Sequence, residues 1–351
     1  MGLSVVLSLK GCELVALRVI DFGTVPPLRS QTIWHALARS AGGQGPVTLS
    51  FMRPSAPYVG IGLHRNVAEI NQTYCGENGL PVFRRQVGGG PVYLDNNQLF
   101  FQVSISRKEL PASRQAAIRK LLAPFAQAFR AAGVAAELDQ AGEISHLGAK
   151  VCGHGAGEID DGVVVVGNLI ERFDHGRAAA ILNTGSEFVS EQLEQLMRRF
   201  VGSFDQSIDS DAFIQAAIEA LANELGIDAV AGDLDEQEWE SVREFDSLLG
   251  DPSWTASPEF AVPPLREIRV VKIRAGVFCA FRTSVKPTFF MSSVFGLVEH
   301  FVSDDAGLDS EFVGCDSNAV VESLQLRGWI SESDSGYLTS SGFLQREAVA
   351  R

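Results

Sequence analysis

The chain has 351 residues, a length that suits one large domain accompanied by a small one. Hydrophobic residues make up 46% of the sequence and charged residues 21%, which is the balance of a folded globular protein. The formal net charge of −14 disfavours general binding to nucleic acid or to anionic membranes. No apolar run approaches the roughly 18 residues that a membrane-spanning helix needs.

The N-terminal stretch MGLSVVLSLKGC (residues 1–12) has no basic residue ahead of its short apolar run. We therefore expect a first β-strand there and not a secretory signal. The cysteines are widely spaced and form no C-x-x-C pair; they are Cys12, Cys75, Cys152, Cys279 and Cys315. This pattern predicts free thiols in a reducing, cytoplasmic compartment, with neither a zinc site nor a disulfide scaffold.

The first part of the chain mixes short β-branched strands with amphipathic helical patterns. Strands are predicted at residues 12–23, 46–54 and 57–64. SQTIWHALARSA (30–41) predicts a helix with Ser30 as its N-cap, and a short polar helix follows at 66–79.

Next come three consecutive glycines, Gly88, Gly89 and Gly90, between two strands predicted within residues 80–107. The long helical pattern at 112–133 contains Pro124, which should kink the helix or mark its restart. Further strands are predicted at 135–139, 144–157 and 161–174.

The chain then becomes helical and acidic, with helices predicted at 190–202, 210–226 and 235–250. Residues 251–267 contain four prolines and are the best candidate for a linker. Strands at 268–284 and 288–297 and a helix at 317–329 predict a small C-terminal α/β domain. Because strands are grouped and do not alternate regularly with helices, we expect an α+β fold, with mixed or antiparallel sheets flanked by helices. The predicted domains are residues 1–262 and 263–351.

Two glycine-rich turns each follow a strand that carries a cation. RRQVGGG places Arg84 and Arg85 before the triplet, and GAKVCGHGAG places Lys150 before Gly153 and Gly155. Taken singly, a triplet is often a tight turn and such a lysine is usually a surface residue. Brought together, the two turns would supply backbone N–H donors, a planar arginine and a lysine charge to one anion.

Other chemical signatures are weaker or missing. The sequence has no P-loop motif, no H-E-x-x-H and no G-x-S-x-G elbow. His35 lies in a helical pattern beside Trp34 and is expected to be structural, whereas His154 lies inside a glycine turn where a ligand could be bound. Cys152 is a candidate nucleophile, although a lone thiol on a strand is more often a small core residue.

The stretch YVGIGLHRNVAEINQTYCGENGLPVFRRQVGGGPVYLDNNQLFF, followed by GAKVCGHGAGEIDDGVVVVGNLIERFD, resembles the lipoate–protein ligase family. That family shares its catalytic module with biotin–protein ligases and octanoyl transferases, and the likeness covers roughly residues 17–260. The resemblance implies a catalytic domain with this fold and a small C-terminal accessory domain. It also implies ATP-dependent activation of lipoate or octanoate as acyl-AMP, with Mg²⁺, followed by transfer to a lysine of a lipoyl acceptor domain.

Carried onto this sequence, the resemblance makes Lys150 the catalytic residue, in contact with the ATP phosphates and the acyl carboxylate. The implied acyl-adenylate contacts are Arg85, Gly88, Gly89, Gly90, Pro91, Val92, Tyr93 and Lys150; further candidates are Arg84, Asp95, Gly153, His154 and Gly155. No metal-ligating residue is implied. The chain departs from the family pattern at Val87, Leu94, Gly142-Glu143 and Val165-Val166-Gly167, which leaves acyl preference, acceptor choice and activity itself to be established.

Two other functions remain open: an octanoyl or lipoyl transferase that uses a cysteine thioester, and a non-catalytic scaffold of the same fold. Biotin ligation is disfavoured because the arginine–glycine–arginine loop of that family is absent. We expect a monomer that binds neither nucleic acid nor membrane. A basic rim for docking the acceptor is predicted at Arg107, Lys108, Arg114, Arg119 and Lys120, where a solvated helix face is the plain alternative.

Overall fold

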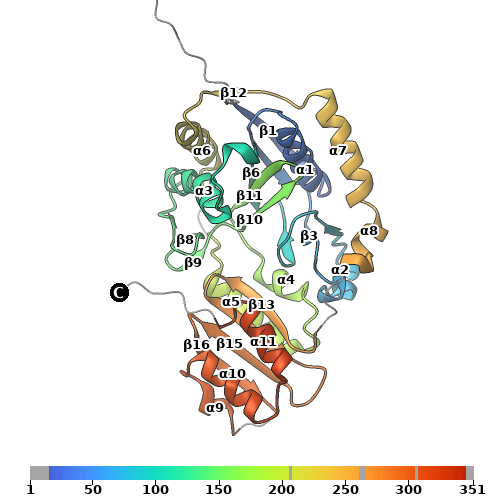
Figure 1. The fold of residues 1–351 in the computed structure, drawn as a ribbon, viewed down its shortest axis with the longest axis vertical. Coiled ribbons are helices and arrows are strands. Elements are labelled where there is room, and N and C mark those ends of the chain that lie inside the picture. Colours follow the sequence, from blue (N-terminus) through green and yellow to red (C-terminus); the bar gives the residue numbers. More distant parts are fainter. Residues whose placement is uncertain (1–15, 205–207, 261–265, 305–306, 345–351) are drawn as a thin grey trace, which may run out of the picture.

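A computed structural model describes residues 16–204, 208–260, 266–304 and 307–344 (Figure 1). The strand predicted at residues 1–12 lies outside this part of the chain. The predicted α+β class is confirmed, because sheets with both parallel and antiparallel neighbours are flanked by helices. Within the described ranges, no helix combines the length and the apolar composition that crossing a membrane requires.

A six-stranded mixed sheet forms the centre of the larger part. Its order is β10 (His154–Ile159), β11 (Gly162–Ile170), β6 (Gln98–Ser106), β2 (Thr48–Pro54), β1 (Leu17–Val25) and β12 (Ala229–Ala231). Strand β1 pairs in parallel with β2 and β12, whereas β2, β6, β11 and β10 form an antiparallel succession.

Helices cover both faces of this sheet. Successive side chains of a strand point to opposite sides, and β6 carries apolar side chains on both, so each face packs against helices. Phe101 packs against α3 (Arg114–Ala131) and α6 (Ser210–Leu225). Its neighbour Phe100 lies in the core formed with α1 (Arg29–Gly42) and α7 (Glu236–Leu249). Burying one such phenylalanine contributes roughly 2 kcal/mol, so this alternation fixes the sheet between its two helical layers.

The predicted N-cap of α1 needs correction, and of the two outcomes predicted at Pro124, a kink or a restart, the restart is excluded. Ser30 does not cap α1: it lies inside the first turn, and its hydroxyl donates to the Pro27 carbonyl at 2.7 Å. The carbonyls of Pro26 and Leu28 already accept helical hydrogen bonds, so this turn begins without a side-chain cap. Helix α3 does not restart at Pro124, because the helix is buried along this segment and its packing outweighs the roughly 3 kcal/mol that an internal proline costs.

Two small sheets lie below the central sheet. One has the order β4 (Val82–Arg84), β3 (Tyr58–Ile61), β5 (Val92–Leu94), and the other β7 (Glu137–Leu138), β8 (Ile144–His146), β9 (Ala149–Lys150). The short helices α2 (Gln72–Glu77), α4 (His175–Ala180) and α8 (Pro252–Ala256) and the longer α5 (Glu187–Phe200) complete this region.

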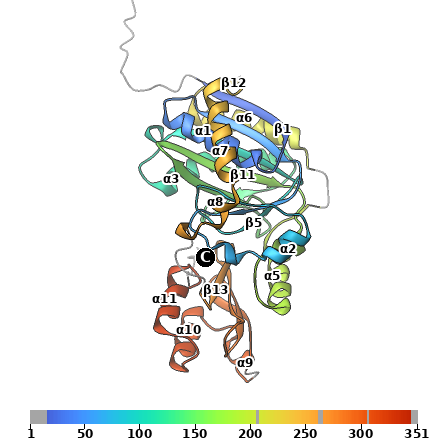
Figure 2. The same ribbon diagram turned by 90° about the vertical axis from the view of Figure 1, so that its right-hand side faces the viewer.

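Residues 266–344, here called the C-terminal unit, contain a four-stranded antiparallel sheet: β13 (Arg269–Arg274), β14 (Val277–Arg282), β15 (Phe289–Val294) and β16 (Leu297–Ser303). Its helices are α9 (Asp309–Phe312), α10 (Ser317–Leu326) and α11 (Glu332–Ser340). One face of the sheet packs on these helices and the other on α4 and α5, so the unit lies directly beneath the small sheets (Figure 2).

Candidate active site

A cavity of about 780 Å³ lies where the central sheet, the small sheets and the C-terminal unit meet. The sequence candidates that line it are Arg85, Gly88, Gly89, Gly90, Pro91, Val92, Tyr93, Lys150, Gly153, His154 and Gly155. The fold therefore brings both glycine-rich turns and their cations to one space. Arg84 and Asp95 are not among the lining residues.

The first glycine turn is held in shape by Arg85. Its guanidinium donates to the carbonyl of Gly88 at 3.0 Å and to that of Gly90 at 2.9 Å. Gly89 has φ of +105°, and a Cβ there would lie 2.6 Å from Nη2 of Arg85. Burial lowers the pKa of Arg85 to about 10, which leaves it charged at neutral pH, and its Nη1 has no hydrogen-bond partner. An unpaired buried donor of this kind suits an anionic ligand.

Arg84 points the other way and is structural. It is fully buried and donates to the carbonyls of Gly62, Leu63 and Arg65 and to that of Thr255 in α8. Its own carbonyl accepts the indole N–H of Trp254 at 2.8 Å. Arg84 therefore lies off the cavity, and its guanidinium is held by backbone carbonyls.

Asp95, another candidate, is a turn residue. It is buried, and its carboxylate accepts the backbone N–H of Asn97 at 3.0 Å, between β5 and β6. The carboxylate of Asp95 thus satisfies a backbone N–H of the turn, and Asp95 does not line the cavity. We interpret Asp95 as a residue that stabilises this turn.

His35 holds the backbone next to Arg85, just before the first glycine turn. Its Nε2 accepts the backbone N–H of Gln86 at 3.1 Å, so the ring hydrogen is on Nδ1, which faces the Gln31 carbonyl at 2.7 Å. Burial lowers the pKa of His35 to about 3, which keeps the ring neutral. The expectation that His35 is structural agrees with these contacts.

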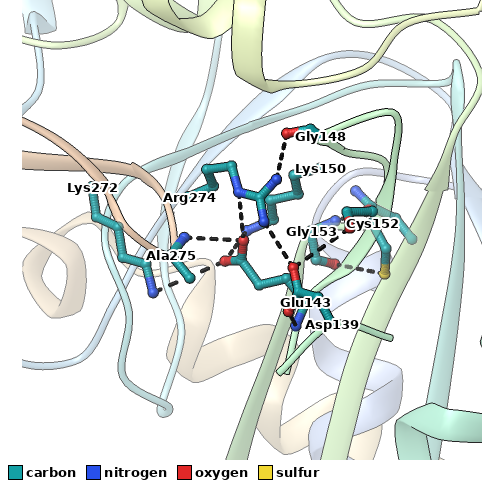
Figure 3. A network of polar contacts seen from close by, with 11 residues as sticks. Asp139, Glu143, Gly148, Lys150, Cys152, Gly153, Lys272, Arg274 and Ala275 are labelled. Atoms are coloured by element: carbon teal, nitrogen blue, oxygen red, sulfur yellow. Dashed lines mark hydrogen bonds and ion pairs between the residues drawn. The ribbon is translucent and has the colours of Figure 1, made fainter. Parts of the chain in front are cut away.

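Lys150 reaches the cavity from β9 and is paired with a residue that the sequence did not single out as functional. Its Nζ lies 3.6 Å from Oε1 of Glu143, a carboxylate only 4% exposed (Figure 3). The same Oε1 lies 3.9 Å from Nζ of Lys272 in the C-terminal unit. Oε2 accepts the backbone N–H of Ala275 at 3.0 Å and lies 3.4 Å from Nε of Arg274.

The charges around Glu143 keep it ionised. Burial by itself would raise the pKa of this carboxyl group. The positive charge of Lys150, the Ala275 N–H and the charges of Lys272 and Arg274 outweigh burial, and the pKa lies below its ordinary value. In the sequence, the one signal for a functional role of Glu143 was that Gly142-Glu143 departs from the family pattern.

Arg274 completes the connection between the two parts of the chain. Nη2 of Arg274 lies 2.7 Å from Asp139, and Nη1 donates to the carbonyl of Gly148. Its side chain is only 6% exposed, so the ion pair is shielded from solvent. The segment of residues 139–150, here called the Lys150 loop, is therefore anchored to β13.

The second glycine turn is oriented by a polar chain from the central sheet. The N–H of Gly153 donates to Oδ1 of Asn168 at 2.6 Å, and Nδ2 of Asn168 donates to Gln98 at 2.7 Å. Burial and the charge of Lys150 lower the pKa of His154 to about 4, and its Nδ1 is buried without a partner. His154 is thus neutral at physiological pH and beside Lys150.

Cys152 does not have the environment of a nucleophile. It is fully buried, and burial raises the pKa of its thiol to about 12. A thiol needs a lowered pKa and access to react as a thiolate. Among the described residues, no cysteine lines the cavity.

The same cavity also has many apolar lining residues. Those from β6, β11, α4, α5, β13 and β14 include Phe100, Val166, Ile170, Ala178, Met197, Val270, Val271, Ile273 and Phe281. The space therefore offers both charged groups and apolar surface to one ligand.

Two of the three arginines of the predicted rim border a second hollow of about 350 Å³, whereas Arg107 lies beside Glu158. Arg114 and Arg119 line it together with Gly142 and His154, and His154 also lines the main cavity. Arg114 donates to the Ala156 carbonyl at 3.0 Å, whereas Arg119 donates to the Asp139 carbonyl at 2.8 Å. These acceptors are neutral, so both positive charges remain available to a partner.

The family described as Lipoyl protein ligase A/B catalytic domain matches residues 26–226 of the chain. Lipoate–protein ligase 1 of Staphylococcus aureus is 23% identical over 269 residues, which are 74% of this chain and 78% of that protein.

Solved structures share the fold. The bipartite lipoate protein ligase of Thermoplasma acidophilum, solved in a study of that enzyme and its E2 lipoyl domain, superposes with a TM-score of 0.61 at 21% identity and covers 69% of this chain and 96% of its own. Lipoate–protein ligase A bound with ATP superposes with a TM-score of 0.56 at 22% sequence identity. The match covers 69% of this chain and 98% of that chain. LipL1 of P. falciparum, in complex with lipoate, superposes with a TM-score of 0.55 at 14% sequence identity. This match covers 93% of this chain and 98% of that chain.

Proposed function

Since this chain is a ligase that belongs to the lipoyl protein ligase A/B catalytic domain family, we propose that it activates lipoate or octanoate with ATP and transfers the acyl group to a lysine of a lipoyl acceptor domain. The observation that carries the proposal is that the glycine turn held by Arg85 and the side chain of Lys150 line one cavity, together with many apolar residues. Two structurally similar proteins support ATP and lipoate as the substrates: lipoate–protein ligase A was solved with ATP, and LipL1 was solved with lipoate.

In the first half-reaction the carboxylate of the acyl substrate attacks the α-phosphorus of ATP and expels pyrophosphate. Negative charge grows on the α-phosphoryl oxygens, and a lysine placed beside them stabilises the transition state more than the ground state. Lys150 is held for this role by Glu143, whose place a substrate anion would take. Nη1 of Arg85 and the N–H groups of the glycine turns would bind the nucleotide.

Mg²⁺ is expected to arrive with ATP as the counter-ion of its phosphates. Within the described ranges, no group of three or more histidine, cysteine or acidic side chains could hold a metal ion. The carboxylates that line the cavity, Glu69 and Glu143, are engaged by cations of the protein. The residues present thus suit a metal ion delivered by the substrate.

In the second half-reaction the acceptor amine attacks the acyl carbon of the mixed anhydride, and AMP leaves. Lys150 would polarise the carbonyl oxygen, and no protein nucleophile is needed. The thioester route is disfavoured by the fully buried thiol of Cys152, whose pKa is raised to about 12. A non-catalytic scaffold would tolerate Lys150→Ala without loss of turnover, whereas a ligase would not.

The test is lipoate-dependent exchange of labelled pyrophosphate into ATP, with wild type beside Lys150→Ala. It requires no acceptor and isolates the first half-reaction. Exchange by the wild type with a loss of at least about a hundredfold in the variant would support an adenylating ligase. Equal exchange in the two proteins would remove Lys150 from the chemistry, and absence of exchange in the wild type with either lipoate or octanoate would contradict adenylation.

A further inference from the structure

We propose that Lys272, on β13 of the C-terminal unit, is a phosphate-binding residue of the adenylation site and binds the pyrophosphate that leaves. The inference rests on the proposed function and adds to it a second lysine, supplied by a different part of the chain. None of the sequence motifs indicates this residue.

The first support is position. Lys272 lines the main cavity, and its Nζ lies 3.9 Å from Oε1 of Glu143. Nζ of Lys150 approaches the same oxygen at 3.6 Å. Figure 3 shows the two lysines reaching Glu143 from separate elements, β9 and β13. Because both ammonium groups lie within 4 Å of one oxygen, a single polyphosphate chain that takes the place of this carboxylate could contact both.

The second support is charge. Glu143 faces both lysines and Arg274, whereas Asp139 neutralises Arg274 only. One carboxylate therefore balances two lysines, and positive charge is left over beside the cavity. In a chain with net charge −14, such a local excess is the kind of field that draws in a polyphosphate.

The third support is anchoring. The side chain of Lys272 is 55% exposed and packs little, so its position depends on the backbone of β13. That backbone is tied to the Lys150 loop two and three residues further on, where Arg274 pairs with Asp139 and the Ala275 N–H donates to Glu143. Lys272 is thus held within reach of the site and yet is free to move onto a ligand.

The chemistry divides between the two lysines. As the acyl carboxylate oxygen bonds to the α-phosphorus, the bond from that phosphorus to the α,β-bridging oxygen breaks, and its electron pair stays on pyrophosphate. Lys150 faces the α-phosphoryl oxygens and the carboxylate. Lys272 donates charge-assisted hydrogen bonds to the phosphates that carry the departing charge, and no proton changes owner.

The test compares Lys272→Met with Lys286→Met, which removes an exposed lysine of the same unit that does not line the cavity. Equilibrium binding of magnesium pyrophosphate, measured by calorimetry, should weaken at least about tenfold in Lys272→Met and remain unchanged in the control. In pyrophosphate exchange the KM for pyrophosphate should rise by a similar factor while the KM for lipoate stays constant, and Lys272→Arg should recover part of the loss.

Two further measurements separate this proposal from the proposed function. Transfer from chemically prepared lipoyl-AMP to a lipoyl domain bypasses ATP and should proceed at the wild-type rate in Lys272→Met. Equal pyrophosphate binding in Lys272→Met and wild type, or an equal loss in exchange and in transfer, would overturn the role of Lys272. Because calorimetry needs no turnover, its result decides the matter even if the wild type failed to exchange.

Discussion

Nζ of Lys150 lies 3.6 Å from the carboxylate of Glu143, and that same carboxylate accepts the N–H of Ala275 in the C-terminal unit. One buried acidic side chain thus restrains the lysine of the large part and anchors the small part beneath it. A substrate anion that takes over Lys150 would leave Glu143 to Arg274 and to the Ala275 N–H. The site and the interface between the two parts therefore share a residue.

Glu143→Gln should destabilise the protein markedly. The amide can still accept the Ala275 N–H but leaves the buried charge of Arg274 less compensated, so we expect the free energy of unfolding to fall by about 3 kcal/mol. Urea unfolding measures the change. Glu299→Gln is the control, since its pair with Arg199 is exposed and should contribute less than about 1 kcal/mol. Equal effects of the two substitutions would contradict a buried anchoring role.

Gly89→Ala should impair the glycine turn, whereas Gly88→Ala should not. A Cβ at Gly89 would meet Nη2 of Arg85 at 2.6 Å and would have to adopt φ of +105°, but a Cβ at Gly88 meets nothing within 4 Å. We expect kcat/KM for pyrophosphate exchange to fall at least about tenfold in the first variant and less than about threefold in the second. Similar losses in both would mean that the turn is not held by Arg85.

Charge reversal of Arg114 and Arg119 should weaken acceptor docking. Their charges border the hollow that shares His154 with the main cavity and have neutral backbone partners. The double variant Arg114→Glu/Arg119→Glu should raise the KM for the acceptor domain by about tenfold at low salt and leave pyrophosphate exchange intact. Arg243→Glu on α7, away from both hollows, is the control. If exchange and transfer fell together, the basic rim would not be an acceptor site.

Cys152→Ala should retain both half-reactions. The thiol is fully buried, so its removal leaves a small void and should lower the free energy of unfolding by about 1 kcal/mol. Steady-state transfer of lipoate to a lipoyl domain is the measurement, with expected rates within about threefold of the wild type. Loss of transfer with intact exchange would instead favour a thioester at this position.

Stability should fall as the medium is acidified, in part because of His35. Its pKa is about 3 in the folded protein against 6.5 ordinarily, so below pH 6.5 the unfolded chain binds a proton that the folded chain does not. Stability is therefore full above pH 6.5 and is lost progressively toward pH 3, by about 2 kcal/mol at pH 5. Urea unfolding at pH 7 and pH 5 should show a smaller fall in His35→Gln than in the wild type. An identical fall would mean that His35 binds a proton without loss of the fold.

The sequence by itself determined the local parts of this site. The glycine triplet, Arg85 and Lys150 lie in motifs a few residues long, and their chemistry follows from residue type and spacing. Most elements of the central layer were also predictable, because the apolar alternation of Leu99, Phe101, Val103 and Ile105 in β6 is periodic over one segment. The burial of α1 on nearly every side, from Ser30 to Ala38, was not predictable in this way.

The resemblance already favoured Arg85 over Arg84 as a ligand contact, but only the tertiary structure decided how each arginine is held and which distant charges complete the cavity. Arg84 and Arg85 are indistinguishable by type, but one is held by the carbonyls of residues 62–65 and the other lies along the glycine turn. Glu143, Arg274 and Lys272 meet only because the C-terminal sheet packs against the loop that carries Lys150. Contacts between segments so far apart depend on how whole layers dock, and no periodicity within one segment encodes that.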